Sequence, residues 1–420
     1  MAHAPISLGS GGGYGSDDCT ASLDYVLAGK TAIASDSNDE PGNGRMTVNS
    51  LLSFSCAAYS GRRILAKWQN PKAATGKPYS GVIIRYSTSG YPGKTGGTQI
   101  YKGAGSNTAS GGQSQTYLDM PALNTTYYLS CTPYVTTNQG DLLGDTLNAT
   151  VKTSAEQTVT IKATQNYTIP VGFSKMDTFC VGGGGGGARG EDGDSSTAGH
   201  GGGGGGGGYT KTITGTAISA GQVLACTIGA GGSSATNPID GGTTSIIRSG
   251  TTINSAAGGK SCGFAYSSGG NGGSGGGSGG YWHSNSAQNA GGSGGSNGGD
   301  GGGNLTPGKG QGTTTRAFGS SSGTAYSGGG GAGGGGTGSS ARNAGAGGAT
   351  GGGRGGDGAY AISSSSEGTE WSYAKSGTTA TANTGGGGGG GGGGARSSMS
   401  ANAEGMPGAG ASGIILIRLY

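Results

Sequence analysis

The chain is poor in charged and aromatic residues. Of its 420 residues only 10% are Asp, Glu, Lys or Arg and 6% are Phe, Trp or Tyr, and the formal net charge is +4. Nucleic-acid binding requires a basic patch or stripe, which so small a supply of charge does not provide. We therefore expect no nucleic-acid partner.

Long apolar runs and paired cysteines are also missing. The longest apolar run, Ile414 to Ile417, has the length of one strand, so no membrane insertion is expected. The N-terminus has no charged start followed by an apolar stretch, which predicts a protein made in the cytoplasm without a signal peptide. The cysteines show no CxxC pair and no His at zinc spacing, so we expect mostly free, buried thiols and no metal site. They are Cys19, Cys56, Cys131, Cys180, Cys226 and Cys262.

Motifs for catalysis and for cofactors are absent or incomplete. The three Gly-Lys-Ser/Thr phrases lack the first glycine of a phosphate-binding loop, and none of the three histidines has a hydrolase context. Glu367 and Glu370 could form a glycosidase pair, and the cluster Glu191-Asp192-Gly193-Asp194 could bind calcium. Solvated loops explain both more simply. We expect neither an enzyme nor a cofactor.

Glycine is abundant and unevenly distributed. Only 21 of the 107 glycines lie in residues 1–154, so the composition changes sharply near Ser154. This change predicts a glycine-rich domain over residues 155–420. The preceding part divides into a short entry segment, residues 1–45, and a domain over residues 46–154.

The three longest glycine runs cannot be ordinary linkers if they are ordered. They are Gly182 to Gly187, Gly201 to Gly208 and Gly385 to Gly394. Ordering eight glycines costs roughly 8–16 kcal/mol, whereas each backbone hydrogen bond returns about 0.5–1.5 kcal/mol. Runs packed side by side as polyproline II helices could bond to several neighbours at once, because that helix has three residues per turn and no internal hydrogen bonds. We predict a lattice of such polyglycine II helices.

Other glycine-rich stretches repeat as Gly-Gly-x, for example Gly269 to Ser274 and Gly291 to Ser296. With three residues per turn, every x lies along one edge of the helix. We therefore expect these helices at the outside of the lattice, with Ser or Asn facing water.

Residues 46–154 alternate apolar and polar side chains in short runs separated by Gly, Pro and Asn. This pattern predicts a small antiparallel β-sandwich, with Trp68 pointing inward and an inward set of Tyr127, Leu129 and Cys131. The domain resembles a fibronectin type III domain, in which Trp68 takes the place of the early core Trp and Tyr127 that of the late-strand Tyr. The resemblance implies a spacer or a weak surface binder, without chemistry of its own.

Short strand-like segments begin and end the glycine-rich part. Val181 leads into the first run, and the phrases TIGAGG (227–232), GGTTS (241–245) and SGIILIR (412–418) follow in order. This combination resembles the glycine-rich domain of phage tail-fibre and tail-tip proteins, and the phrase VLAGKT (26–31) resembles a small unit of phage tail proteins. The overall fold class is therefore expected to be mainly β, with a β-base that carries the glycine helices.

The resemblance implies a virion component that recognises a bacterial surface glycan or protein through loops between the glycine runs. Residues 1–45 would attach the chain to other virion proteins of the tail or baseplate, and a homo-oligomer stays open. The alternative is a structural decoration or fibre protein without specific receptor binding. Large side chains interrupting the glycine-rich sequence are the candidate receptor-binding residues. They are Tyr281, Trp282, His283, Arg316, Phe318, Tyr360, Trp371, Tyr373 and Arg396.

Overall fold

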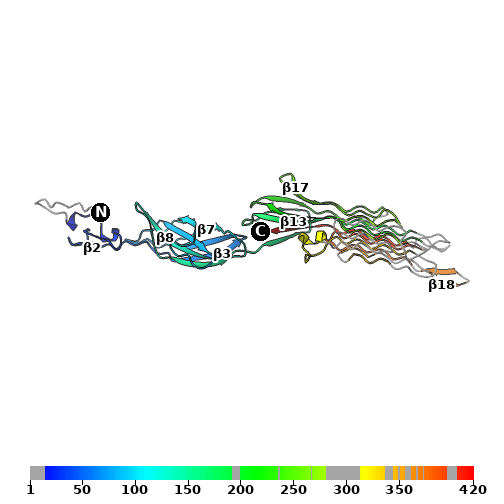
Figure 1. Cartoon of the computed structure of the whole chain (residues 1–420), viewed down its shortest axis with the longest axis horizontal. Helices are drawn as coiled ribbons and strands as arrows, with labels where there is room; N and C mark the ends of the chain where they lie inside the picture. The colour runs from blue at the N-terminus through cyan, green and yellow to red at the C-terminus, as the bar shows by residue number, and fades with distance from the viewer. Residues whose placement is uncertain are drawn as a thin grey trace. The chain divides into compact units, whose positions relative to one another are not determined.

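The structure of the protein is a computed structural model, and its fold is mainly β, as predicted. The residues that it describes are 15–191, 199–234, 237–265, 267–280, 313–335, 344–348, 351–354, 361–365, 368–371, 373–394 and 404–420. Within them the only helical elements are four short 3₁₀ turns. The chain divides into two compact units, Met1–Glu156 and Gln157–Tyr420 (Figure 1).

The first unit begins with a small polar module held together by an arginine. Arg45 donates to Asp24 at 2.9 Å and forms a second ion pair with Asp36. The backbone of Leu27 bridges that of Met46, which closes the module. Polar contacts therefore order this segment, as its low apolar content requires. Its elements are η1 (Ser16–Asp18), η2 (Leu23–Tyr25), β1 (Thr31–Ala32) and β2 (Gly42–Asn43).

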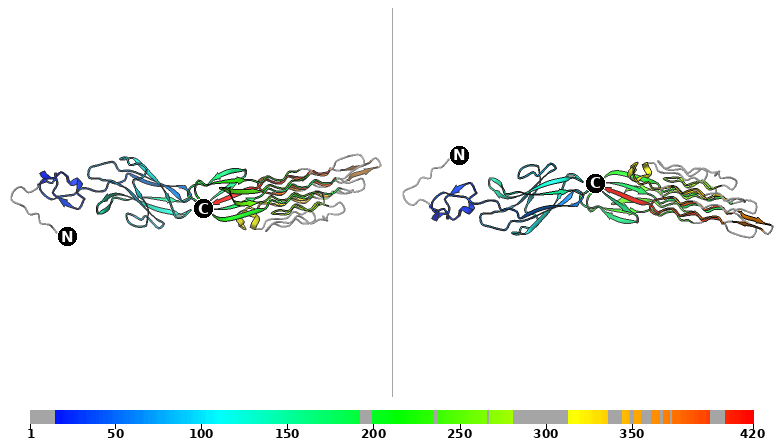
Figure 2. Two further views of the ribbon diagram at one scale, coloured as in Figure 1. Left: turned by 90° about the horizontal axis from the view of Figure 1, so that it is seen from above. Right: turned by 90° about the horizontal axis from the view of Figure 1, so that it is seen from below.

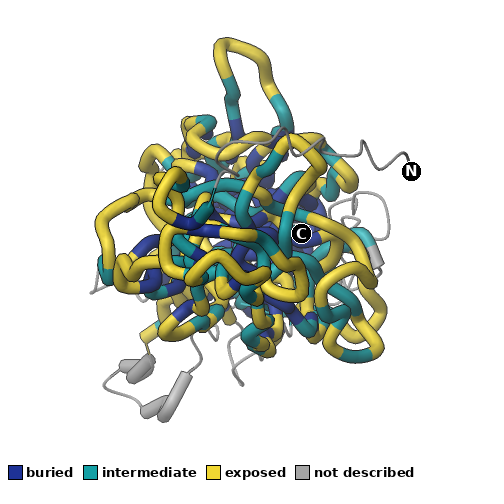
Figure 3. Tube along the Cα trace, turned by 90° about the vertical axis from the view of Figure 1, so that its left-hand side faces the viewer, coloured by how far each residue is buried: buried dark blue, intermediate teal, exposed yellow. Residues whose placement is uncertain are grey.

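Two antiparallel sheets with a common core follow. The strand order of the smaller sheet is β3-β4-β7 and that of the larger is β10-β8-β5-β6, with β9 pairing to β8. Their bounds are β3 (Ser53–Ser60), β4 (Arg63–Gln69), β5 (Gly81–Ser87), β6 (Thr98–Gly103), β7 (Gln113–Asp119), β8 (Thr126–Thr137), β9 (Gly140–Leu143) and β10 (Leu147–Lys152). In Figure 3 exposed stretches of the trace form outer turns around buried stretches.

The core of the sandwich contains the side chains expected from the sequence. Trp68, Leu129 and Cys131 are fully buried, and Tyr127 is 1% exposed. The Tyr127 hydroxyl accepts a hydrogen bond of 2.9 Å from the backbone N–H of Ala122. Buried aromatic rings with a polar atom need such a partner, so this bond fixes the turn before β8.

The second unit begins and ends in one sheet. The order of this sheet is β11-β20-β13-β14, so the first strand of the unit pairs with its last. A second sheet of order β12-β15-β16-β17 completes the base. The bounds are β11 (Gln157–Ile161), β12 (Gln165–Thr168), β13 (Lys175–Val181), β14 (Thr210–Ala217), β15 (Val223–Thr227), β16 (Thr244–Arg248), β17 (Thr251–Ala256) and β20 (Ile414–Leu419).

Asp177 of β13 anchors the final strand. Its carboxylate is 3% exposed and accepts hydrogen bonds from the Gly215 N–H at 2.8 Å and the Tyr420 hydroxyl at 2.9 Å, and also from the guanidinium of Arg418. Burial alone would raise the pKa of Asp177, but these hydrogen bonds together hold it below its ordinary value. The carboxylate therefore stays charged and ties the C-terminal residues to the base.

The glycine runs leave the ends of the base strands and pack side by side as extended helices (Figures 1 and 2). Along the first run, every third N–H donates to the same neighbouring segment. The pairs are Gly184–Ala411, Gly187–Gly408 and Gly190–Gly405; Gly185–Gly206 and Ala188–Gly203; and Gly183–Gly242 and Gly186–Ile239, at 2.8–3.1 Å. A period of three with bonds only to neighbours is the pattern of polyglycine II helices.

The run Gly385–Gly394 has six neighbours. Its N–H groups donate to residues 185–191, 328–334 and 375–378, and its carbonyl groups accept from residues 202–208, 353 and 405–411. Outgoing runs lie parallel to it and returning runs antiparallel, because both directions place donors at the same threefold spacing. Backbone hydrogen bonding on all sides takes the place of a side-chain core.

Neighbouring helices are too close for side chains at most lattice positions. A Cβ atom added at Gly205, Gly387 or Gly390 would lie far inside van der Waals distance of a carbonyl oxygen on another run. Ala188 and Ala332 are exceptions, since the lattice holds their methyl groups at 1% and 0% exposure. Glycine is thus required by the spacing of the helices.

One expectation about the Gly-Gly-x stretches is wrong. Asn271 is exposed, as predicted, but Ser274 is fully buried, and its hydroxyl donates to the Ser327 carbonyl at 2.5 Å. Gly273 bonds to Gly207 in a parallel sense, whereas Ser274 begins a stretch that runs antiparallel to the same neighbour. The chain reverses direction between Gly273 and Ser274. The threefold spacing that places Asn271 on the outside therefore does not continue to Ser274.

Candidate binding surface at the end of the glycine lattice

The lattice has two unequal ends. One end joins the base strands, and the other carries the first charged residues that follow the glycine runs. Figure 1 places β13 at the base and the hairpin of β18 (Ala361–Ser365) and β19 (Gly368–Trp371) at the opposite end of this unit. We call the residues at that end the distal rim. They are Arg189, Glu191, His200, Tyr373, Lys375 and Glu404.

An ion pair links two segments of the distal rim. Arg189 ends the first outgoing run, and its Nη1 lies 2.6 Å from Oε1 of Glu404, which begins the last returning run. The arginine side chain is 38% exposed and the glutamate 14%. The pair is therefore partly screened by solvent, and it presents a guanidinium edge at the surface.

Backbone bonds fix the positions of the neighbouring rim residues. The N–H of Glu191 donates to the His200 carbonyl at 2.8 Å, and Gly394 donates to the Glu191 carbonyl at 3.1 Å. Burial lowers the pKa of His200, opposed in part by the Glu191 carboxylate, which favours the neutral imidazole near pH 7. Three different runs thus end at the same level.

Tyr373 adds an aromatic group to the rim. It is 75% exposed, and the chain continues to Lys375, whose carbonyl accepts a hydrogen bond of 3.0 Å from Gly392. An aromatic ring beside paired charges and hydrogen-bonding groups suits recognition of sugars or of polar protein surfaces. The described rim residues thus offer an exposed aromatic ring, charged groups and hydrogen-bonding groups at one end of the lattice.

The candidates named from the sequence fall into three groups. Tyr281, Trp282, His283, Tyr360 and Arg396 lie outside the described residues. Trp371 ends β19, which pairs with β18, and Tyr373 lies on the rim. The sequence also suggested a glycosidase pair and a calcium-binding cluster. Glu367 of the pair and residues 192–194 of the cluster lie outside the described residues, whereas Glu370 is part of β19.

Arg316 and Phe318 lie at the base, away from the rim. They belong to a short segment with η3 (Thr313–Thr315) and η4 (Ala317–Gly319) that covers β13. The Phe318 ring packs 6.3 Å from that of Phe179 and lies under the Arg418 guanidinium at 4.8 Å. Arg316 donates to the Gly323 carbonyl at 2.9 Å. The contacts of both side chains therefore stabilise the base.

Four rim residues escaped the sequence analysis as binding candidates: Arg189, His200, Lys375 and Glu404. A signal for them existed in the sequence. Arg189 is the first charged residue after the first glycine run, and His200 directly precedes the second run. In a lattice of aligned runs, residues at these junctions must gather at one level.

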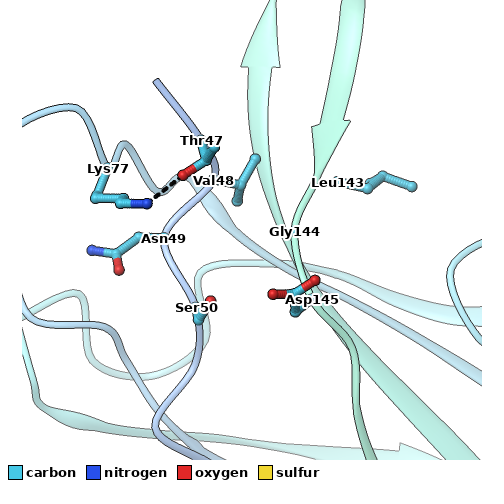
Figure 4. A pocket seen from close by; sticks show the side chains of 8 residues that line it. All are labelled: Thr47, Val48, Asn49, Ser50, Lys77, Leu143, Gly144 and Asp145. Atoms are coloured by element: carbon cyan, nitrogen blue, oxygen red, sulfur yellow. Dashed lines mark hydrogen bonds between the residues drawn. The ribbon is translucent and has the colours of Figure 1, made fainter. Parts of the chain in front are cut away.

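The first unit contains a polar pocket of about 340 Å³ (Figure 4). The segment Thr47 to Ser50 and Lys77 line one side, and Leu143 to Asp145 line the other. Lys77 donates to the Thr47 hydroxyl at 2.5 Å, and Asn49 donates to the Lys72 carbonyl at 2.7 Å. Its main polar donors thus have partners within the protein, so the pocket is a weaker candidate than the rim.

Two other site types find no support among the described residues. No group of three or more His, Cys, Asp or Glu side chains there is placed to hold a metal ion. In the same part of the chain, no helix has the length and hydropathy of a membrane span. All six cysteines are free thiols, and burial raises the pKa of Cys180 to about 12 and that of Cys226 to about 11.

Comparison with known sequences bears on the second unit. No curated protein matches the chain. Residues 158–420 match a family described as the glycine-rich domain, and the match begins within β11 and ends at the last residue of the chain. It therefore covers the base, the lattice and the rim together. The chain belongs to the glycine-rich domain family.

Proposed function

We propose that the protein is a bacteriophage tail-fibre or tail-tip adhesin that recognises a bacterial surface glycan or protein through the distal rim and the segments bordering it. The observation that carries this proposal is the arrangement of the glycine runs. They form a rod of hydrogen-bonded helices with few buried side chains, and the Arg189–Glu404 ion pair lies at the end opposite the base.

The chemistry of the junctions supports recognition at that end. The lattice interior accepts almost no side chain, so varied side chains can occur only where the runs begin and end. In the sequence, Trp282 and Arg396 each come two residues after a glycine-rich stretch, which ends at Gly280 and at Gly394, and Tyr360 follows another such stretch. Binding sites with aromatic and arginine anchors on a rigid support lose little entropy on binding.

The rest of the chain fits an adhesin that is carried on a virion. The entry segment, residues 1–45, would attach the protein to other tail proteins, because its polar module offers surface groups but little core. The sandwich would serve as a fibronectin type III-like spacer. Its two sheets pack three and five antiparallel strands around one core, and Tyr127 bonds back to the backbone before β8 as a tyrosine corner does.

The second candidate is a structural fibre or decoration protein without a receptor. The hydrogen bonds between the described runs favour it, because such a rod would be stable whatever its end displays. The two functions differ in one property. Only an adhesin should lose cell binding when exposed rim side chains are removed while its stability is unchanged.

The test is saturation binding of the purified chain to intact host cells. Trp371→Ala and Tyr373→Ala should each weaken binding roughly thirtyfold, the typical loss for an aromatic anchor. Tyr91→Ala is the matched control, since Tyr91 is 51% exposed on the sandwich. Unchanged binding by both the Trp371 and the Tyr373 variant, at wild-type melting temperature, would favour the structural candidate.

A further inference from the structure

The outer face of the small sheet of the sandwich carries an aromatic pair that no core explains. In the register of β3, β4 and β7, outward positions form rows across the sheet. One row contains Ala57, Leu65 and Tyr117, and Arg63 lies opposite Asp119 in the next. Tyr59 lies near the end of β3, beside both rows. We call Tyr59, Tyr117, Arg63 and Asp119 the tyrosine platform.

The two tyrosine rings touch each other and remain open to solvent. Their centroids are 4.8 Å apart with an interplanar angle of 57°, although β4 separates their strands. Tyr59 is 55% exposed and Tyr117 is 48% exposed. A side-chain hydrogen bond with Tyr59 raises the pKa of Tyr117. The ring contact therefore joins β3 and β7 on the outer face of the sheet.

A neutral ion pair borders the rings. Arg63 donates through Nε and Nη2 to the two carboxylate oxygens of Asp119, each at 2.7 Å. The Asp119 side chain is still 59% exposed, so its outer lone pairs can accept further hydrogen bonds. On the other side of the row that contains Leu65 and Tyr117, Lys67 lies opposite Gln115 on the same face. The aromatic surface is thus bordered by groups that both donate and accept.

We propose that the tyrosine platform is a second binding surface, separate from the distal rim, and that its ligand is a neutral hexose unit of a polysaccharide. A pyranose ring has an apolar face that can lie on an aromatic ring and a rim of hydroxyl groups that donate and accept hydrogen bonds. The Arg63–Asp119 pair adds no net charge of its own, and its donors and acceptors suit the hydroxyl groups of an uncharged sugar.

A macromolecular protein partner fits this face less well. The apolar part is limited to two rings with Leu65 and Ala57, and polar residues follow directly in the rows on either side. A stable protein interface needs about 1,200 Å² or more of buried surface with an apolar centre. A small stacked ligand needs only the platform itself.

The experiment is co-sedimentation of the full chain with insoluble neutral polysaccharides, namely microcrystalline cellulose, chitin and cross-linked dextran. Stacking on a ring face selects weakly among hexoses, so at least one of the three should deplete the protein from solution. Tyr59→Ala and Tyr117→Ala should each lower the partition constant about tenfold. Tyr117→Phe should retain most of the binding, because the ring remains.

Controls separate this surface from the rest of the molecule. Tyr91→Ala removes an equally exposed ring from another part of the sandwich, and this variant should bind the polysaccharide as the wild type does. Tyr373→Ala tests whether the distal rim takes the same sugar. Failure of the wild type to bind any of the three, or equal binding by the two platform variants, would overturn the proposal. Loss of binding in Tyr373→Ala alone would assign the sugar to the rim instead.

Discussion

Replacing one interior glycine by alanine should destabilise the whole lattice. Gly205 lies in the second run, where its N–H donates to Gly388 at 2.9 Å and its carbonyl accepts from Gly330 at 2.8 Å. The added methyl group would collide with the carbonyl oxygen of Gly185, which belongs to the first run. Because all three partners are backbone atoms of packed helices, no flexible side chain can move aside.

The expected loss follows from the hydrogen bonds around the collision. Moving the second run away from the first breaks the bonds from Gly185 to Gly206 and from Ala188 to Gly203, both 2.8 Å long. Each broken bond between buried groups costs about 1–3 kcal/mol, so two broken bonds cost about 2–6 kcal/mol. Alanine returns about 0.4–1 kcal/mol by restricting the unfolded chain. The net free-energy loss is about 1–6 kcal/mol.

Differential scanning calorimetry of the purified chain measures this effect. A loss of that size should lower the melting temperature of the glycine-rich unit by about 2–24 °C. Gly263→Ala is the control, since an added Cβ there meets no atom within 4 Å and the glycine is exposed. If Gly205→Ala has the same melting temperature as Gly263→Ala and the wild type, the close spacing of the runs is not the reason that glycine is required.

Three further predictions test other parts of the account. The hydrogen bonds to Asp177 hold the pKa of its carboxylate below the ordinary value of 3.8. Its contribution to stability is therefore present above that pH and is lost as the pH falls through the pKa of the folded state. Acid unfolding of Asp177→Asn should lack this pH dependence. Tyr127→Phe should cost the sandwich about 1–3 kcal/mol in urea unfolding, because the Ala122 N–H loses its acceptor, and an unchanged midpoint would contradict the assigned role. Deleting residues 1–45 should leave a folded protein that no longer enters virions, and normal incorporation would refute the attachment role.

The parts of the fold that sequence could predict are those set by local geometry. Polyglycine can be ordered only by bonding to neighbours, so the threefold helices follow from Gly182 to Gly187 alone. Alternation in the sandwich likewise identified Trp68 and Tyr127 as core residues, and the terminal strands of the second unit pair as expected.

The parts that escaped prediction depend on where the chain reverses and on which runs become neighbours. Ser274 is buried because the chain turns just before it, which a threefold count along the sequence does not reveal. Phe318 packs on the base because its backbone adopts a left-handed conformation, with φ of 54°, that returns the ring to Phe179. The Arg189–Glu404 pair joins residues more than 200 positions apart, and only the lattice register brings them together.

The central claim is that the end of the lattice, and not its body, determines what the protein binds. The most direct measurement exchanges segments 281–312, 355–372 and 395–403 for those of a glycine-rich relative from a phage with a different host. All glycine runs, the base and the sandwich stay unchanged, and adsorption of the resulting virions to both hosts is counted. We predict that host preference follows the exchanged segments. Adsorption that keeps to the original host would contradict the account.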